Sequence, residues 1–274
     1  MAGRYERTLR RVATVVAVAV LSLSACGSSD EPASTPSTTA NPEPLERLPQ
    51  VPQPSESTHP TSPDGAGGDA FLTQVFDDAQ AMWRQEFEAA GDEYRPATIT
   101  IFRDQVHTEC GTQSAGIGPF YCPADHGVYL DTRFFDALGR AAGVKLGDFA
   151  RAYVVAHEVG HHVQALLGTM QAVRQADEQD QACTNARSVR LELQADCFAG
   201  IWTHSSYRRG ELTRTDFEDA LRAAAVVGSD FQQAKTTGTI KPEDWTHGSS
   251  SQRQHWLTTG FEQGKPSACD TFGS

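Results

Sequence analysis

The uneven distribution of proline divides this chain into parts. Nine of the fourteen prolines lie in residues 27–68, a stretch of Ser, Thr, Pro, Glu, Asn and Gly with hardly a large apolar side chain. Such a segment buries too little apolar surface to offset the conformational entropy lost on folding. We therefore expect residues 26–68 to form a disordered tether, and residues 69–274 to form a single folded domain.

The first 25 residues have the order of parts of a signal peptide. Four arginines precede an apolar core at residues 12–23, which is shorter than the roughly 20 residues of a membrane-spanning helix. The following Leu23-Ser24-Ala25-Cys26-Gly27 resembles the lipobox of bacterial lipoproteins, whose cysteine is acylated and becomes the mature N-terminus. This predicts an exported protein held on the extracytoplasmic face of the cell membrane by lipid on Cys26. An ordinary export signal with an incidental cysteine is the alternative.

The charge balance is acidic. The full chain has a net charge of −12, and loss of residues 1–25, with four arginines and Glu6, makes it −15. This sign argues against non-specific binding to nucleic acid, so membrane attachment is expected to depend on lipid. The charge also favours basic or neutral peptides as ligands.

Periodicity in residues 69–274 predicts an α+β domain rich in helices, with a small sheet early in the domain. Apolar residues at helical spacing begin at Phe71 and stop at Gly91. Alternation predicts strands at 97–103 and Gly127–Asp131, on either side of a turn-rich stretch at 116–123. Further helices are predicted at 148–168 with Asp148 as N-cap, at 184–209, at 215–227 behind a Thr215/Glu218 capping box, and at 250–262.

The predicted helix at 148–168 carries the motif His157-Glu158-Val159-Gly160-His161. The i, i+4 spacing places both histidines on one helix face, where they can bind one metal ion. Glu158 is rotated away from that face and can reach a metal-bound water as general base. Gly160 is unfavourable inside a helix and indicates that another group packs close there. We expect His162 to lie at the surface or behind the ligands.

A third ligand is expected from the predicted helix at 184–209. Glu192 and Asp196 are also four residues apart, in a stretch that is apolar on almost all sides, so a solvated acidic face explains them poorly. We assign Glu192 as the third zinc ligand and Asp196 as the hydrogen-bond acceptor that orients a ligand histidine. The two carboxylates could exchange these roles.

Several longer motifs resemble one family. The pattern HExxH with a later ExxxD is that of gluzincins, and HEVGHHVQ, ELQADCFAGIW, THGSSSQR, CDTF and GPFYCPADHGVYLD are similar to the bacterial neutral zinc metallopeptidase family over roughly residues 69–272. The resemblance implies a zincin-type domain with one Zn²⁺ per chain, bound by His157, His161 and Glu192, and endopeptidase activity.

The expected mechanism is hydrolysis of a peptide bond by a zinc-activated water, with Glu158 moving its proton to the leaving amine. His247 is a candidate donor to the oxyanion, although a histidine in a loop or helix cap is an equally good reading. Membrane-bound gluzincins have a similar Thr-His followed by an arginine, a position that Arg253 fills here. Tyr129 and its strand are candidates for the edge strand that pairs with an extended substrate.

Five cysteines remain in the domain, and an exported protein allows them to form disulfides. Cys110 and Cys122 flank a Gly/Pro-rich loop and are expected to be bridged, bracing the cleft. Cys183 and Cys197 lie too far apart along one straight helix to pair. One of them is expected to pair with Cys269, leaving an odd thiol.

These observations predict a lipid-anchored extracytoplasmic zinc endopeptidase that acts on peptides or proteins. The alternative is a non-catalytic envelope lipoprotein that keeps zinc for folding or for binding a partner. Glu158 favours the enzyme, because a structural zinc site does not need it. An amidase that acts on peptidoglycan is a third reading, although that chemistry more often accompanies other zinc motifs.

Overall fold

The computed structural model describes residues 68–114, 116–143 and 147–273. The predicted signal peptide, Cys26 and almost all of the tether lie outside the described residues, so these predictions stay untested. No helix in the described ranges has the length and apolar character needed to cross a bilayer.

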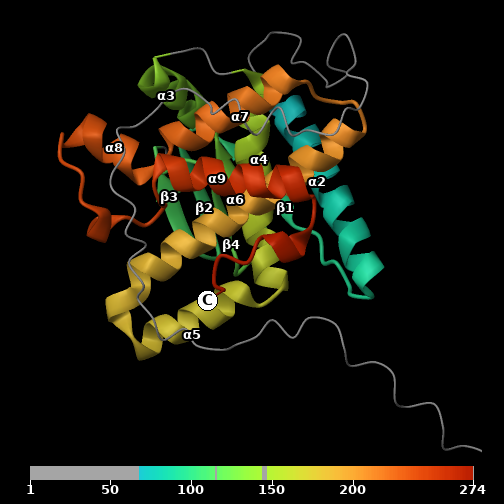
Figure 1. Ribbon diagram of the computed structural model, residues 1–274, viewed down its shortest axis with the longest axis horizontal. Coiled ribbons are helices and arrows are strands. Elements are labelled where there is room, and N and C mark those ends of the chain that lie inside the picture. The colour runs from blue at the N-terminus through green and yellow to red at the C-terminus, as the bar shows by residue number, and fades with distance from the viewer. Residues whose placement is uncertain (1–67, 115, 144–146, 274) are drawn as a thin grey trace, which may run out of the picture.

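The described residues form a helix-rich α+β domain, which confirms the predicted fold class (Figure 1). The α-helices are α2 (Asp69–Ala90), α3 (Thr132–Ala142), α4 (Asp148–Leu166), α5 (Thr169–Gln179), α6 (Thr184–Arg208), α7 (Arg214–Val226), α8 (Ser229–Thr236) and α9 (Ser250–Gln263). Three short 3₁₀ turns are η1 (Gln181–Cys183), η2 (Pro242–Asp244) and η3 (Pro266–Ala268). The strands are β1 (Thr98–Phe102), β2 (Gln105–Thr108), β3 (Gly111–Ser114), β4 (Phe120–Cys122) and β5 (Gly127–Asp131).

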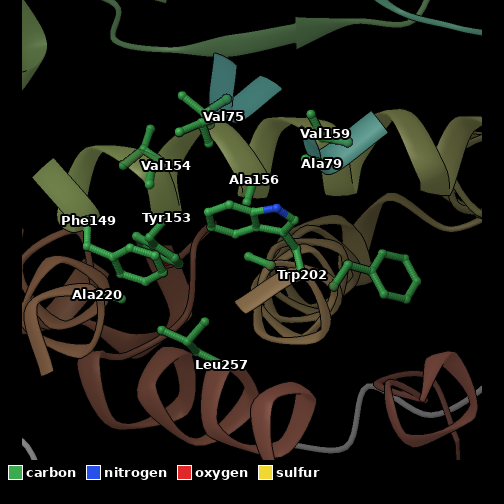
Figure 2. Packing of buried hydrophobic residues seen from close by; sticks show 14 of the residues in the cluster. Val75, Ala79, Phe149, Tyr153, Val154, Ala156, Val159, Trp202, Ala220 and Leu257 are labelled. Carbon is green, nitrogen blue, oxygen red and sulfur yellow. The ribbon is translucent and has the colours of Figure 1, made fainter. Parts of the chain in front are cut away.

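Helix α4 is the central element of the domain. It is buried from Phe149 to Gln164 almost without interruption, and it contacts α2, α5, α6, α7 and the strands β4 and β5. A helix that is apolar on all sides needs neighbours on all sides, which explains this position. Figure 2 shows Trp202 of α6 beneath Ala156 of α4, and the Trp202 ring stacks on Phe149 with 5.6 Å between centroids.

The sheet is small and mixed, with strand order β1-β5-β4. Strand β5 is fully buried and pairs in parallel with β1 and antiparallel with β4. Strand β4 is therefore an edge strand, and β2 and β3 form a separate antiparallel hairpin. The turn-rich stretch at 116–123 thus contains a strand that its glycines and prolines conceal from pattern analysis.

Two predicted helix starts are wrong by one or two residues. The N-cap of α4 is Gly147, and Asp148 is the first helical residue. The capping box of α7 is formed by Thr213 and Asp216 rather than by Thr215 and Glu218. Both pairs fit the same four-residue pattern, and Thr215 lies inside the first turn.

Candidate metal centre

Helix α4 brings His157 and His161 together on one face, with 4.7 Å between ring centroids. Each ring is fixed through its Nδ1 atom. His157 Nδ1 lies 2.9 Å from Asp196 Oδ1, and His161 Nδ1 lies 2.8 Å from Gln164 Oε1. With Nδ1 donating to these oxygens, the Nε2 atom of each ring is left as the metal-binding atom.

The third donor comes from α6, which approaches α4 closely at Gly160. A Cβ atom at Gly160 would lie 3.0 Å from the Ala195 carbonyl oxygen, so only glycine allows this approach without a shift. The approach places Glu192 against both histidines, with 3.4 Å from each Nε2 atom to a Glu192 carboxylate oxygen. The packing expected at Gly160 is therefore supplied by α6.

The same geometry distinguishes the two carboxylates of α6. Glu192 faces the Nε2 atoms, whereas Asp196 is bonded to Nδ1 of His157 and is completely buried. The assignment of Glu192 as ligand and Asp196 as the orienting group is the one that this arrangement favours.

The donor set fits zinc. One donor atom from each of His157, His161 and Glu192 lies within 4.8 Å of the others. Two imidazoles and one carboxylate are a known ligand set of catalytic zinc sites, which leave a further coordination position open.

Charge at this centre is balanced among buried groups. Burial alone would lower the pKa of His157, but the charge of Asp196 and the hydrogen bonds that His157 donates to Asp196 and Glu192 raise it to about 10. Burial would raise the pKa of Glu192, but hydrogen bonds from the two histidines hold it well below its ordinary value. The carboxylate of Glu192 is thus ionised and ready to bind a cation.

The metal centre opens into a cavity of about 640 Å³. Glu158 lines this cavity beside His157 and His161, and its side chain is buried. Burial raises the pKa of Glu158 above its ordinary 4.5, which makes its carboxylate a stronger base. Residues Phe120 and Tyr121 of the edge strand β4 line the same cavity.

His247 and Arg253 also line this cavity. His247 is exposed to it, and the Thr246 hydroxyl lies 2.9 Å from Nδ1 of the ring. Arg253 is buried and donates to both oxygens of Asp196, through Nε and Nη2, at 2.8 Å each. Arg253 therefore orients His157 indirectly, by holding the Asp196 carboxylate to which His157 is bonded. Its Nη1 atom lies 3.8 Å from a carboxylate oxygen of Glu192.

Sequence reasoning missed two residues of this centre. Tyr153 donates from its hydroxyl to Asp196 at 2.5 Å, and Gln164 holds the ring of His161. Both lie on α4 one turn away from a ligand histidine, at i−4 and i+3, and both are polar residues in an apolar helix. A polar residue one turn from a motif histidine in an apolar helix is the sequence feature that could have identified them.

The expectation for Tyr129 is wrong. Its strand, β5, is the central strand of the sheet, and Tyr129 is buried, stacked on Phe120 and bonded to Asp125. The edge strands of this sheet are β1 and β4, and β4 is the one with residues in the cavity lining, so β4 is the strand that can pair with an extended chain there.

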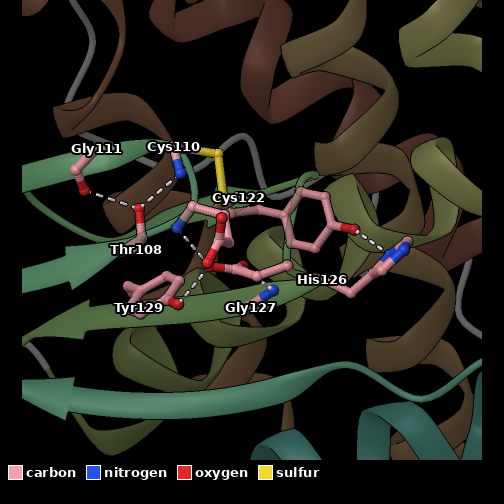
Figure 3. Close-up of a disulfide and its surroundings, with 10 residues drawn as sticks. Thr108, Cys110, Gly111, Cys122, His126, Gly127 and Tyr129 are labelled. Carbon is pink, nitrogen blue, oxygen red and sulfur yellow. Dashed lines mark hydrogen bonds between the residues drawn. A yellow bond between two sulfur atoms is a disulfide. The ribbon is translucent and has the colours of Figure 1, made fainter.

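Two disulfides stabilise segments next to the cavity. The expected Cys110–Cys122 bridge joins the turn between β2 and β3 to the end of β4 (Figure 3). Cys197 pairs with Cys269, one of the two pairings left open. Cys183, the fifth cysteine of the domain, is disulfide-bonded as well, so the expectation of an odd thiol is wrong.

His162 is not a surface residue. It is completely buried, with Nε2 at 2.7 Å from the Arg95 carbonyl oxygen and Nδ1 at 3.0 Å from the Tyr121 hydroxyl. Through Tyr121 it connects α4 to the edge strand β4.

Comparison with known proteins agrees with this geometry. The model of the family described as "Putative neutral zinc metallopeptidase" matches residues 14–272. The chain belongs to this family. The match begins well before residue 69, so the family resemblance extends further toward the N-terminus than the motifs indicate.

Proteins similar to this chain are found in bacteria. The chain is 44% identical to the uncharacterized protein YpfJ of Escherichia coli K12 over 213 residues, which cover 77% of this chain and 74% of YpfJ. It is 45% identical to the uncharacterized protein Rv2575 of Mycobacterium tuberculosis H37Rv over 191 residues, 66% of this chain and 64% of that protein. No solved structure matches the chain. The family description supports zinc binding and a peptide-hydrolysing class of activity for this chain.

Proposed function

We propose that the chain is a zinc-dependent endopeptidase in which Glu158 is the general base. The observation that carries this proposal is the position of Glu158 in the cavity onto which the His157, His161 and Glu192 donors open. A site that holds zinc only for folding has no need of an additional buried carboxylate at the open side. Glu158 is thus the feature that favours the enzyme over a structural zinc protein.

Zinc bound by these three residues supplies Lewis-acid chemistry, lowering the pKa of water toward about 7 and polarising a carbonyl oxygen. Glu158 takes the proton of the attacking water at its carboxylate and delivers it to the nitrogen of the leaving amine. Asp196 keeps the proton of His157 on Nδ1, so that the ring keeps its orientation during turnover.

His247 is the proposed donor to the oxyanion. Desolvation in the cavity lowers the pKa of His247 from 6.5, which favours the neutral ring near pH 7. With the Thr246 hydroxyl donating to Nδ1, the neutral ring carries its proton on Nε2. That N–H can donate to the oxygen that becomes negative in the transition state.

The test is metal content and hydrolysis of an unfolded protein substrate by the wild type and Glu158→Gln. We expect about one zinc per chain in both proteins, and about 10²- to 10⁴-fold slower hydrolysis by the variant, since it loses the general base. Glu178→Gln, on the exposed side of α5, is the matched control and keeps full activity. A wild type without zinc at neutral pH, or a variant as active as the wild type, overturns the proposal.

We also propose that lipid on Cys26 anchors the protein to the extracytoplasmic face of the cell membrane. The order of arginines, short apolar core, small residues and cysteine supports this. Cells grown with a labelled fatty acid are expected to label the wild type and to leave Cys26→Ser unlabelled and detached from membranes. Equal labelling of both proteins, or of neither, contradicts the proposal.

A further inference from the structure

The segment between α8 and α9, residues 237–249, is attached to α6 by hydrogen bonds. Asn185 Nδ2 donates to the Glu243 carbonyl oxygen at 2.9 Å, and the Ser188 hydroxyl donates to the Thr246 carbonyl oxygen at 3.0 Å. Asn185 and Ser188 stand at i and i+3 on α6, so they lie on one face of that helix. Because both bonds join a side chain of α6 to the backbone of the segment, α6 determines the path of the segment.

Apolar packing continues this contact along α6. Gly248 is buried and has a φ angle of +79°, which favours glycine. A Cβ atom there would lie 3.1 Å from Leu193 Cδ2 and 3.3 Å from Val189 Cγ1, both on α6. These contacts lie on either side of Glu192 in the helix. The helix that supplies the carboxylate donor of the metal centre therefore also carries the segment that contains His247.

The peptide unit that joins Thr246 to His247 is held by two serines. Its carbonyl oxygen accepts the hydrogen bond from Ser188, and its N–H donates to the Ser229 hydroxyl at 3.4 Å. Ser229 is the first residue of α8, and its backbone N–H donates to the Gly248 carbonyl oxygen at 2.8 Å. We term Ser188 and Ser229 the serine clamp. Because a peptide unit is planar, bonds to both of its polar atoms fix the direction in which the next side chain leaves the backbone.

Thr246 connects the serine clamp to the imidazole ring. Its carbonyl oxygen is bonded to Ser188, and its hydroxyl lies 2.9 Å from Nδ1 of His247. Ser188 and His247 both line the cavity. Ser188 is four residues before Glu192 on α6, so the clamp and the metal donor lie on neighbouring turns of one helix face. The position of the His247 ring is therefore set from the same helix as the position of Glu192.

We infer that Ser188 is a positioning residue, which together with Ser229 holds His247 in the cavity with Nε2–H free to meet the oxyanion. The inference rests on the proposed function, in which His247 is the donor. A donor stabilises the transition state only if it is in place before charge develops, to within about 0.5 Å. A histidine on a connecting segment obtains this precision by attachment to a helix.

The kinetic test uses the full protein with zinc, and fluorophore-labelled casein as an unfolded substrate. Ser188→Ala is expected to lower kcat by about 10- to 100-fold with KM nearly unchanged, because the displaced ring contacts the transition state rather than the substrate. Ser188→Thr keeps the hydroxyl and is expected to recover most of the kcat. Competition with a chelator is expected to show unaltered zinc affinity in both variants, since neither removes a metal donor.

Asn185→Ala is the matched control. It removes one hydrogen bond from α6 to the same segment, but at Glu243 rather than next to His247. We expect it to keep kcat close to that of the wild type. The double variant Ser188→Ala/His247→Ala is expected to be no slower than His247→Ala, because the clamp acts through the ring. Equal losses in Ser188→Ala and Asn185→Ala, or additive losses in the double variant, overturn the inference.

A spectroscopic readout separates this inference from the proposed function. With ¹⁵N-labelled histidine, and His247→Ala to assign the signal, we expect a single Nε2–H tautomer of His247 in the wild type and its loss in Ser188→Ala. Absence of hydrolysis by the wild type overturns the endopeptidase, and the tautomer comparison then tests the clamp alone. An unchanged His247 spectrum in Ser188→Ala, or an unchanged kcat beside an active wild type, overturns the clamp and leaves the endopeptidase standing.

Discussion

Asp196 contacts three different groups around the metal centre. It accepts hydrogen bonds from the Tyr153 hydroxyl, from His157 Nδ1 and from two nitrogens of Arg253. Burial would raise the pKa of Asp196, but the charges of Arg253 and His157 hold it below its ordinary 3.8. A fully buried carboxylate is thus kept ionised by its partners, and it fixes the orientation of a ligand ring.

We predict that Asp196→Asn weakens zinc binding by about 10- to 100-fold, because the Nδ1 proton of His157 loses its charged acceptor. The variant should also lose about 3–5 kcal/mol of unfolding free energy, since Arg253 is left buried beside a neutral amide. Competition with a chromophoric chelator and urea titration measure the two effects. Asp104→Asn, whose side chain is 92% exposed, is the control, and equal zinc affinity in all three proteins contradicts the role given to Asp196.

His162 gives the molecule a pH-dependent stability. Burial lowers its pKa from 6.5 to about 4, so between these values the unfolded chain binds a proton that the folded protein excludes. The contribution of neutral His162 to the free energy of unfolding is fully present above pH 6.5. It is lost as the pH falls toward 4, at up to about 1.4 kcal/mol per pH unit. His162→Gln lacks this titration. Urea titrations of both proteins at one zinc concentration should give curves that converge with falling pH, and parallel curves contradict the prediction.

At the scale of elements, the crossing of α6 and α9 is the closest helix contact near the site. A Cβ atom at Gly260 would lie 1.9 Å from the Cys197 carbonyl oxygen, and one at Gly200 would lie 2.2 Å from the Leu257 carbonyl oxygen. Figure 1 shows α9 lying across α6. This crossing brings Arg253 of α9 to Asp196 of α6.

We predict that Gly260→Ala separates the two helices and costs at least about 1–3 kcal/mol of unfolding free energy, as overpacked cores do. The Arg253–Asp196 contact should lengthen, so zinc affinity falls as well. His255→Ala, at an exposed position of α9, is the control for a change in the same helix. A Gly260→Ala protein as stable as this control would show that the crossing tolerates a larger side chain.

The elements differ in how well the sequence predicts them. The helices with long apolar periodicity, such as α4 and α6, and the motif ligands on them follow from local spacing. The strand β4 does not, because three residues in a Gly/Pro-rich loop become a strand only by pairing with β5. Gly200 and Gly260 owe their importance to a contact between distant segments, and the start of α7 fits two overlapping capping patterns. Gln164 and Tyr153 could have been predicted from the sequence, because each lies one helical turn from a candidate ligand histidine.

At the scale of the whole molecule, two disulfides connect different segments to the metal-binding cavity. Cys197–Cys269 attaches the C-terminal segment to α6, where Gln194 donates to the Cys269 carbonyl oxygen at 3.0 Å. Gln164 donates in turn to Gln194 and contacts Nδ1 of His161, so a hydrogen-bonded chain runs from the C-terminal segment to a candidate metal ligand. Cys110–Cys122 instead attaches the β2–β3 hairpin to the edge strand β4.

The positions of these bridges predict opposite effects on stability and activity. The sequence separations are 72 and 12 residues, so loop-closure entropy gives about 4 kcal/mol for Cys197–Cys269 and about 3 kcal/mol for Cys110–Cys122. The double variant Cys197→Ala/Cys269→Ala should therefore lose more unfolding free energy. Cys110→Ala/Cys122→Ala should show the larger rise in KM for peptides, since β4 lines the cavity. Urea titration shows which variant loses more unfolding free energy, and steady-state kinetics shows which has the larger rise in KM. If one variant is the more impaired in both measurements, the edge strand and the C-terminal segment do not have the separate roles assigned to them here.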